Sequence, residues 1–227
     1  MTCYNESEKV LKLAIESILN QTYSNLELII ILDSPENQNL KNVLNEFKRL
    51  SNKVKLHFNK SNSGIVESLN KAYDMSLGYY LARMDADDIS LPQRISTQVN
   101  FIEKNKLDLV GTGIEYINED GLILGKPKKL RKHNSIVRYL KHGRMGIVHP
   151  TFLMKREVFS RLERYESIPH AEDKDFLARA ILAGFKVGNV PINLFKCRIR
   201  SNSITKTNAH IVHFNGKSIS ESFNISN

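Results

Sequence analysis

The sequence has few cysteines and no long apolar segment, and both shortages narrow the class of protein. Cys3 and Cys197 are the only cysteines among 227 residues, too few for a disulfide framework or a cysteine zinc site. The longest clean apolar run, residues 28–32, is far shorter than the roughly 18 residues that span a bilayer. Residues 1–10 lack the basic and apolar regions of a secretory signal. We therefore expect a cytoplasmic protein in a reducing compartment.

The sequence also lacks several motifs that would identify a particular cofactor, catalytic residue or partner. The GTG of residues 111–113 lies inside an expected strand and lacks the third glycine and the following helix of a dinucleotide-binding loop. His149, which precedes Pro150, is more typical of a turn or a core than of a catalytic site. The sequence contains no aromatic and basic motif of an RNA-binding domain, so we expect no nucleic-acid partner.

Acidic residues are outnumbered, because the chain has 33 Lys and Arg against 24 Asp and Glu, a net charge of +9. Such a balance favours anionic partners, among them nucleotides and membrane surfaces. The densest basic run, KPKKLRK at residues 126–132, has two interpretations. It is either a solvated loop or a peripheral contact with anionic lipid head groups, which would place the protein at the inner face of the plasma membrane.

Helical and strand-like patterns alternate over the first half of the chain. Apolar residues recur at helical spacing in some segments and alternate or run continuously in others. Helices are expected at residues 5–21, 38–50, 65–77 and 93–105, and strands at residues 26–32, 53–59, 79–84 and 107–118. This alternation is typical of an α/β domain with a mostly parallel central sheet flanked by helices.

The second half is less regular, and it contains no convincing boundary to a second domain. Strands are expected at residues 122–125, 149–154, 186–191 and 193–200, and helices at residues 134–143, 155–164 and 171–185. From residue 205 the sequence is polar and weakly patterned, which fits either a loose helix or a disordered tail. We therefore predict one domain over residues 1–204, followed by a polar tail at residues 205–227.

The segment LARMDADDISLP, residues 81–92, places Asp85, Asp87 and Asp88 within four positions at the end of an expected strand. Two carboxylates ~5 Å apart repel by roughly 3 kcal/mol at an effective dielectric constant of ~20. A divalent metal would offset this repulsion, since Mg²⁺ or Mn²⁺ is commonly held by one or two carboxylates and substrate phosphates. A capped turn also accounts for a single Asp, but three acids at a strand end favour the metal site.

A second acidic group, AEDKDF, opens the expected helix at residues 171–185. At helical spacing, Glu172 and Asp175 share a face, whereas Asp173 points elsewhere. Acidic residues in a first turn are also stabilised by the helix dipole, which is the simpler explanation. The group is nevertheless a candidate general base, which a displacement reaction needs besides a metal.

Four segments together resemble family 2 glycosyltransferases, and they follow one another in the order seen in that family. The combination of ARMDADDIS with SILNQTY identifies this family far more specifically than a lone D-x-D motif does. The segments are residues 2–34, 62–95, 149–159 and 171–191. The resemblance covers residues 2–204 and implies a bacterial enzyme with a single GT-A domain, which is Rossmann-like. The implied division is a nucleotide-sugar-binding half at residues 1–118 and an acceptor-side half at residues 119–204.

The resemblance implies a metal-dependent, inverting transfer of a sugar from a nucleotide-diphosphate donor, expected to be a UDP-sugar, to an acceptor hydroxyl. The acceptor would be a glycan or lipid-linked, and the commonest role of the family is bacterial surface polysaccharide or lipooligosaccharide synthesis. The cofactor would be Mn²⁺ or Mg²⁺. The roles carried over by position are donor binding by Thr2, Tyr4, Asp33, Arg83, Asp85 and Asp87, metal binding by Asp87 and Asp88, proton abstraction by Asp173, and acceptor orientation by Glu172.

Two departures from the family pattern leave alternatives open. Relatives usually begin with an apolar strand of the VSVIMPVYN type, whereas Met1 lies inside that strand, so we expect an exposed apolar sheet edge. A misassigned start, a fragment or an impaired copy would each explain this. The usual DDGS reads LDSP here, with Leu32 in place of the first acid and Asp33 as the second. A truncated, non-catalytic nucleotide-binding paralogue and a nucleotidyltransferase are the alternative functions.

Overall fold

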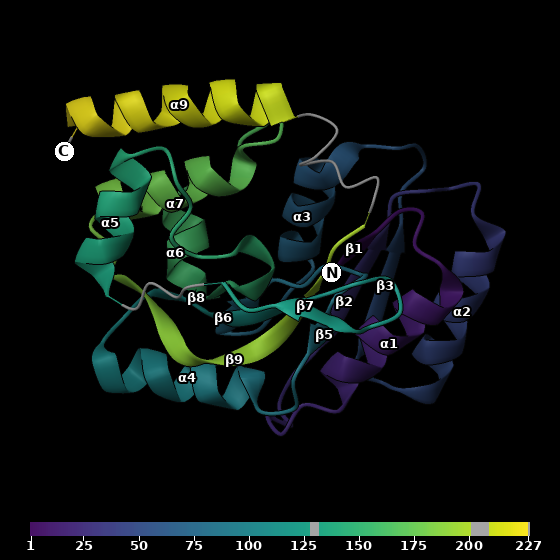
Figure 1. Cartoon of the computed structure of the whole chain (residues 1–227). Helices are drawn as coiled ribbons and strands as arrows, with labels where there is room; N and C mark the ends of the chain where they lie inside the picture. Colours follow the sequence, from purple (N-terminus) through teal and green to yellow (C-terminus); the bar gives the residue numbers. More distant parts are fainter. Residues whose placement is uncertain (128–131, 201–208, 227) are drawn as a thin grey trace.

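A computed structural model describes residues 1–127, 132–200 and 209–226 of the chain (Figure 1). The first sheet has the strand order β1-β2-β3, and both of its strand pairs are parallel. Helices α1 and α2 lie on one side of this sheet and α3 on the other (Figure 1). The elements are β1 Thr2–Cys3, α1 Glu8–Leu19, β2 Leu28–Leu32, α2 Gln38–Leu50, β3 Val54–Phe58 and α3 Gly64–Asp74.

The second sheet is mixed and has the order β4-β8-β6-β9-β5, with β7 paired to β6. Only β6 and β9 pair in parallel, and the other strands of this sheet pair antiparallel. The strands are β4 Tyr80–Ala82, β5 Ile89–Ser90, β6 Leu109–Ile117, β7 Ile123–Gly125, β8 Leu153–Lys155 and β9 Val187–Arg198. The helices are α4 Arg94–Asn105, α5 His133–Lys141, the 3-10 turn η1 His149–Thr151, α6 Arg156–Arg161, α7 Glu172–Leu182 and α9 Ala209–Ser226.

The predicted α/β class is confirmed, and local chemistry explains the first elements. All five residues of β2 are buried, as in a strand covered on both faces. The Ser7 hydroxyl accepts a hydrogen bond from the Val10 amide and caps α1, and the Asn37 side chain caps α2 in the same way. The parallel pairing that we predicted holds for the first sheet, whereas the second sheet gains antiparallel partners because β5, β7 and β8 join it.

Two local predictions are corrected by the structure. Residues 149–154 are not one strand, because the 3-10 turn η1 occupies His149–Thr151 before β8 begins. The two strands expected within residues 186–200 form the single strand β9. Its register against β6 shifts between Val190 and Asn193, as expected where Pro191 has no N–H for the ladder.

The C-terminal segment ends in a helix that belongs to the core. Helix α9 lies across α5 and α7 at the top of Figure 1. Phe223 is 1% exposed and packs in the apolar cluster formed by α5, α6, α7 and β8. We expected either a loose helix or a disordered tail from residue 205. The described part of this segment is a helix, and it packs against the rest of the protein. None of the described helices has the length and apolarity that a bilayer-spanning helix needs.

Strand β1 lies at the edge of the first sheet, near the acidic loop that follows β4. Met1 is buried, and its ammonium group donates to the Ile29 carbonyl 2.9 Å away. Thr2 forms an isolated parallel bridge with Asp85, which connects the first sheet to the acidic loop. A cavity of about 800 Å³ lies between β2 and β4, with Ile29 and Leu81 among its lining residues.

Candidate active site

The acidic loop that follows β4 brings three carboxylates together. The candidate ligand atoms of Asp85, Asp87 and Asp88 all lie within 4.8 Å of one another. Burial raises the pKa of Asp88 well above its usual range, and the charges of Asp85 and Asp87 raise it further. Burial and the charge of Asp85 likewise raise the pKa of Asp87 to about 6, although Arg200 lowers it. The loop therefore stores like-charge repulsion that a cation would relieve.

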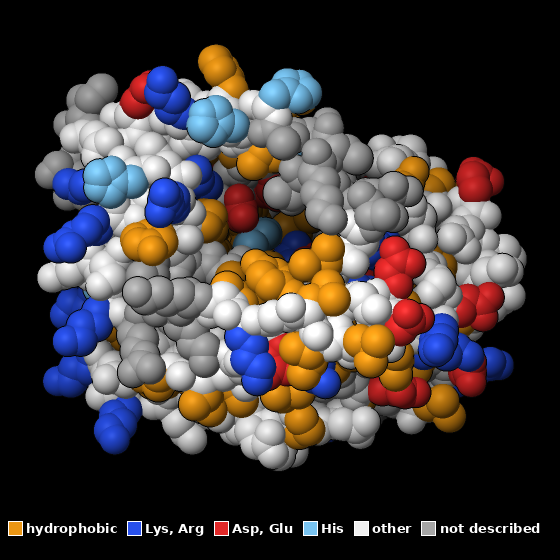
Figure 2. All heavy atoms as spheres, in the orientation of Figure 1, with side chains coloured by type: hydrophobic (Ala, Val, Ile, Leu, Met, Phe, Trp, Pro, Cys, Tyr) orange, Lys and Arg blue, Asp and Glu red, His pale blue; other side chains and the backbone are white. Residues whose placement is uncertain are grey.

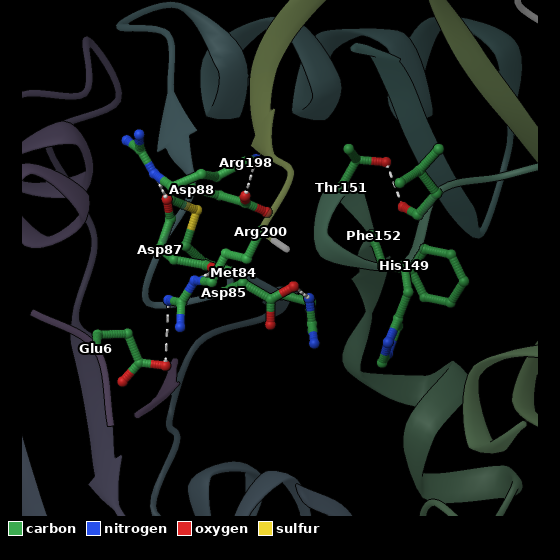
Figure 3. Close-up of polar contacts among 12 residues, drawn as sticks. Glu6, Met84, Asp85, Asp87, Asp88, His149, Thr151, Phe152, Arg198 and Arg200 are labelled. Carbon is green, nitrogen blue, oxygen red and sulfur yellow. Dashed lines mark hydrogen bonds and ion pairs between the residues drawn. The ribbon is translucent and has the colours of Figure 1, made fainter. Parts of the chain in front are cut away.

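This loop is held rigidly by two arginines from other parts of the chain. Arg94 of α4 is fully buried, and its Nη2 atom donates to the Arg83 carbonyl at 2.8 Å. Arg198 at the end of β9 donates from its backbone N to Asp88 Oδ1 at 2.7 Å and from its Nε to the Asp87 carbonyl at 2.8 Å (Figure 3). These hydrogen bonds anchor the backbone on both sides of the loop and hold Asp88 Oδ1 in place.

The carboxylates fit a divalent cation. Asp88 is 2% exposed, and its Oδ2 atom has no hydrogen-bond partner among the described residues. A buried carboxylate oxygen without a partner is costly unless a donor or a cation satisfies it. Mg²⁺ and Mn²⁺ take oxygen ligands. Asp87 and Asp88, the predicted metal ligands, therefore have the chemistry and the proximity that such an ion requires.

Two guanidinium groups already neutralise part of the loop. Arg83 forms an ion pair with Asp85 and is buried. Arg200, just after β9, lies with its Nε 2.8 Å from Asp87 Oδ2 and its Nη2 3.7 Å from Glu6 Oε1 (Figure 3). Each of two acids in the cluster therefore has its own arginine.

The second acidic group lies in the first turn of α7. Burial raises the pKa of both Glu172 and Asp173, and Asp173 Oδ1 accepts a hydrogen bond from the Lys174 amide at 2.7 Å. The charge of Arg83 lowers both of these pKa values. Figure 2 shows a hollow whose floor carries acidic, basic and histidine side chains, in keeping with two acidic groups that face one cleft.

The third acid of this group has a partner on the same helix. Asp175 Oδ2 accepts a hydrogen bond from Arg179 Nε at 2.7 Å, one turn later on α7. Glu172 instead interacts with Asp173, whose charge raises its pKa further. Asp175 is therefore a structural ion-pair partner, and the Glu-Asp pair is the acidic group of the cleft.

Three of the predicted donor-binding residues, Thr2, Tyr4 and Asp33, lie in or just after β1 and β2. Thr2 bridges Asp85, and Tyr4 is 46% exposed. Asp33 is buried, with Oδ1 accepting from Asn59 and Ser63 and Oδ2 accepting from the Gly64 amide at the start of α3.

Leu32, which replaces an acid of the family pattern, is fully buried in the apolar cluster of the first sheet. At this position the chain therefore contributes to the core instead of offering a carboxylate to a ligand.

Three polar residues of this region were not among the predicted site residues. His149 is buried, its Nε2 lies 2.9 Å from the Tyr165 hydroxyl, and burial together with the charge of Arg83 lowers its pKa well below 6.5. His149 lies buried in the 3-10 turn η1, as expected of a turn or core histidine. Arg198 and Arg200 had no motif that could identify them, because only the folded chain brings β9 to the acidic loop.

Comparison with known proteins identifies the family. The family model described as glycosyl transferase family 2 matches residues 1–163. An uncharacterised glycosyltransferase of Methanocaldococcus jannaschii is 35% identical over 211 residues, covering 91% of this chain and 72% of that protein. The O-antigen biosynthesis glycosyltransferase WbnJ of Escherichia coli is 33% identical over 202 residues, covering 88% of this chain and 78% of that protein.

Solved structures share the fold at low sequence identity. S. aureus TarS 1–349 in complex with UDP-GlcNAc superposes with a TM-score of 0.73 at 16% identity, over 91% of this chain and 59% of that one. The mannosyltransferase PcManGT from Pyrobaculum calidifontis, in complex with GDP-Man and Mn²⁺, superposes with a TM-score of 0.68 at 14% identity, over 91% of this chain and 57% of that one. The chain spans less than two thirds of these structures, and its fold is the GT-A fold that we expected.

Proposed function

The chain belongs to glycosyl transferase family 2, and from this we propose that it transfers a sugar from a nucleotide-diphosphate donor to an acceptor hydroxyl with inversion. The observation that carries the proposal is the pair of acidic groups in one cleft. One group, Asp85 to Asp88, suits a metal and a diphosphate, and the other, Glu172 and Asp173, lies across Arg83 from it.

On the donor side, Asp87 and Asp88 would hold Mn²⁺ or Mg²⁺. The bound ion supplies Lewis-acid stabilisation of the departing diphosphate. Thr2, Tyr4 and Asp33 would form the nucleoside end of the site, with the exposed Tyr4 ring available for stacking on the base. Arg83 and Asp85 would contact the donor between the nucleoside and the reacting carbon. A UDP-sugar is the donor that we propose.

On the acceptor side, Asp173 would take the proton from the acceptor hydroxyl as that oxygen attacks the anomeric carbon. The attack comes from the face opposite the diphosphate, which gives inversion. A pKa raised by burial makes the Asp173 carboxylate a stronger base once it is ionised. Glu172 would orient the acceptor beside it.

The names of the relatives support a role in surface polysaccharide assembly. WbnJ is named for O-antigen biosynthesis and AmsE of Erwinia amylovora for amylovoran biosynthesis. We propose a glycan or lipid-linked acceptor and a site of action at the cytoplasmic face of the membrane. The basic run at residues 126–132, which would contact anionic lipid, lies largely outside the described residues.

A panel of nucleotide sugars, with and without Mn²⁺, tests this function. We expect donor binding and slow donor hydrolysis that both require the metal, and we expect Asp87→Ala to abolish metal-dependent binding. Asp173→Asn should keep donor binding while transfer falls at least about a hundredfold, the usual contribution of a general base. Binding by Asp87→Ala at the wild-type level would contradict the assignment of the metal site.

The alternative of a nucleotide-binding protein without transfer activity predicts a different result. The wild-type protein would bind donor with metal but transfer no sugar, and Asp173→Asn would change nothing.

A further inference from the structure

Arg200 occupies one of the carboxylates that a metal would use. Its Nε lies 2.8 Å from Asp87 Oδ2, and Figure 3 shows the guanidinium beside the acidic loop and next to Glu6. The two partners of this ion pair are largely shielded, since the side chains of Arg200 and Asp87 are 29% and 21% exposed. A guanidinium at this distance carries the charge that a divalent ion would otherwise supply.

Arg198 is held by backbone carbonyls, whereas Arg200 contacts the side chains of two acids. Arg198 donates from Nη1 to the carbonyls of Asn118 and Glu119 and from Nε to the Asp87 carbonyl, all within 2.8 Å. In the described part of the chain, the guanidinium of Arg200 contacts the carboxylates of Asp87 and Glu6. It can therefore leave Asp87 without breaking backbone hydrogen bonds of the loop, and Glu6 offers it a second carboxylate.

Two cations cannot share the same face of Asp87 without repulsion. A divalent ion held by Asp87 would repel the guanidinium of Arg200, because the two positive charges would compete for one carboxylate. Binding of the ion therefore favours departure of the guanidinium from Asp87. A diphosphate held by the ion would in turn attract the released group, because a guanidinium pairs with phosphate oxygens through two parallel hydrogen bonds.

We propose that Arg200 is the resident counter-ion of Asp87 in the donor-free protein and that it moves to the donor diphosphate when the metal takes Asp87. This inference rests on the proposed function, since it assigns a positioning residue to the same site. It makes metal binding weaker in the absence of donor and donor binding tighter once the metal is present. The two ligands of the site would thus bind in a coupled way.

Calorimetric titration of Arg200→Ala tests this exchange with two probes, Mn²⁺ alone and UDP at saturating Mn²⁺. We expect Mn²⁺ alone to bind about threefold more tightly than in the wild type, since a partly exposed ion pair no longer competes. We expect UDP to bind about tenfold more weakly, since a charged hydrogen bond to phosphate is lost. Arg49→Ala, an exposed site on α2, removes the same charge and should change neither affinity.

The signs of the two changes decide the outcome. Weaker binding of both probes by Arg200→Ala would mean that Arg200 only orders Asp87, and unchanged binding of both would mean that it has no role. Either result overturns the exchange while leaving the proposed function in place, provided that the wild type binds UDP with Mn²⁺. A wild-type protein that binds neither probe would overturn the proposed function itself. Arg200→Lys, which keeps the charge, should keep the wild-type affinity for Mn²⁺ alone.

Discussion

At the scale of single residues, the acidic loop shows how a fold can tolerate three adjacent carboxylates. From the sequence, we expected a metal ion to neutralise the negative charge of these carboxylates. In the structure, two arginines neutralise part of it, because Arg83 pairs with Asp85 and Arg200 pairs with Asp87. Asp88 accepts the backbone amide of Arg198 and keeps one oxygen unpartnered. The loop is therefore only partly neutralised, which suits it to bind a further cation.

The raised pKa of Asp87 predicts how the metal-free protein responds to pH. Burial and the charge of Asp85 raise this pKa from 3.8 to about 6. Between about pH 4 and 6, the folded chain thus keeps a proton that the unfolded chain has released. The contribution to stability is full below about pH 4 and is lost as pH rises through about 6. We expect the free energy of unfolding to fall over this range by up to about 3 kcal/mol.

Urea unfolding of metal-free protein at several pH values between 4 and 7 measures this dependence. Asp87→Asn cannot ionise, so its free energy of unfolding should vary less with pH than that of the wild type. An equally steep dependence in Asp87→Asn would assign the effect to other groups.

At the scale of secondary-structure elements, the most local segments were the most predictable. Helix α2 was expected at residues 38–50 and lies at Gln38–Leu50, because its apolar spacing, its Asn37 cap and its length are all local properties. Strand β5 was missed, since its two residues carry no pattern and pair with β9 only in the folded chain. Helix α9 was left undecided because its polar sequence conceals a few buried positions.

Helix α9 offers a matched pair of phenylalanines. Phe223 is 1% exposed among α5, α7 and β8, whereas Phe214 on the same helix is 73% exposed. Phe223→Ala should lower the free energy of unfolding by about 3 kcal/mol or more, through lost burial and the cavity left behind. Phe214→Ala should change it by less than about 0.5 kcal/mol. Urea unfolding compares the two, and equal effects would show that α9 is not docked as described.

At the scale of the whole molecule, buried side chains of α4 connect segments that are far apart in the sequence. Arg94 donates to the carbonyl of Arg83 before the acidic loop, and its Nε donates to Gln98 Oε1 at 2.9 Å. Gln98 in turn donates to the Thr151 carbonyl at 2.8 Å, in the turn that contains His149. This buried network holds the start of the acidic loop and the turn η1 against α4.

Arg94→Ala should therefore damage stability more than any exposed arginine substitution. It leaves buried carbonyl and amide oxygens without donors and creates a cavity, at a cost of about 3 kcal/mol or more. Arg49→Ala on the surface of α2 is the matched control and should cost less than about 0.5 kcal/mol. Chemical denaturation of both variants gives the comparison, and similar midpoints for the two would contradict the role of the network.

The sequence by itself determined the α/β class, the first helices and strands, and the two acidic groups, because periodicity, caps and strand ends depend on neighbouring residues. Only the tertiary structure decided which cations meet those acids. Arg198 and Asp88 lie 110 residues apart, and no local pattern marks their contact. Tertiary packing also brought Arg83 close enough to Glu172 and Asp173 for its charge to lower both of their pKa values. Charges act through space, so their partners follow from the packing of distant strands, which spacing along the chain does not encode.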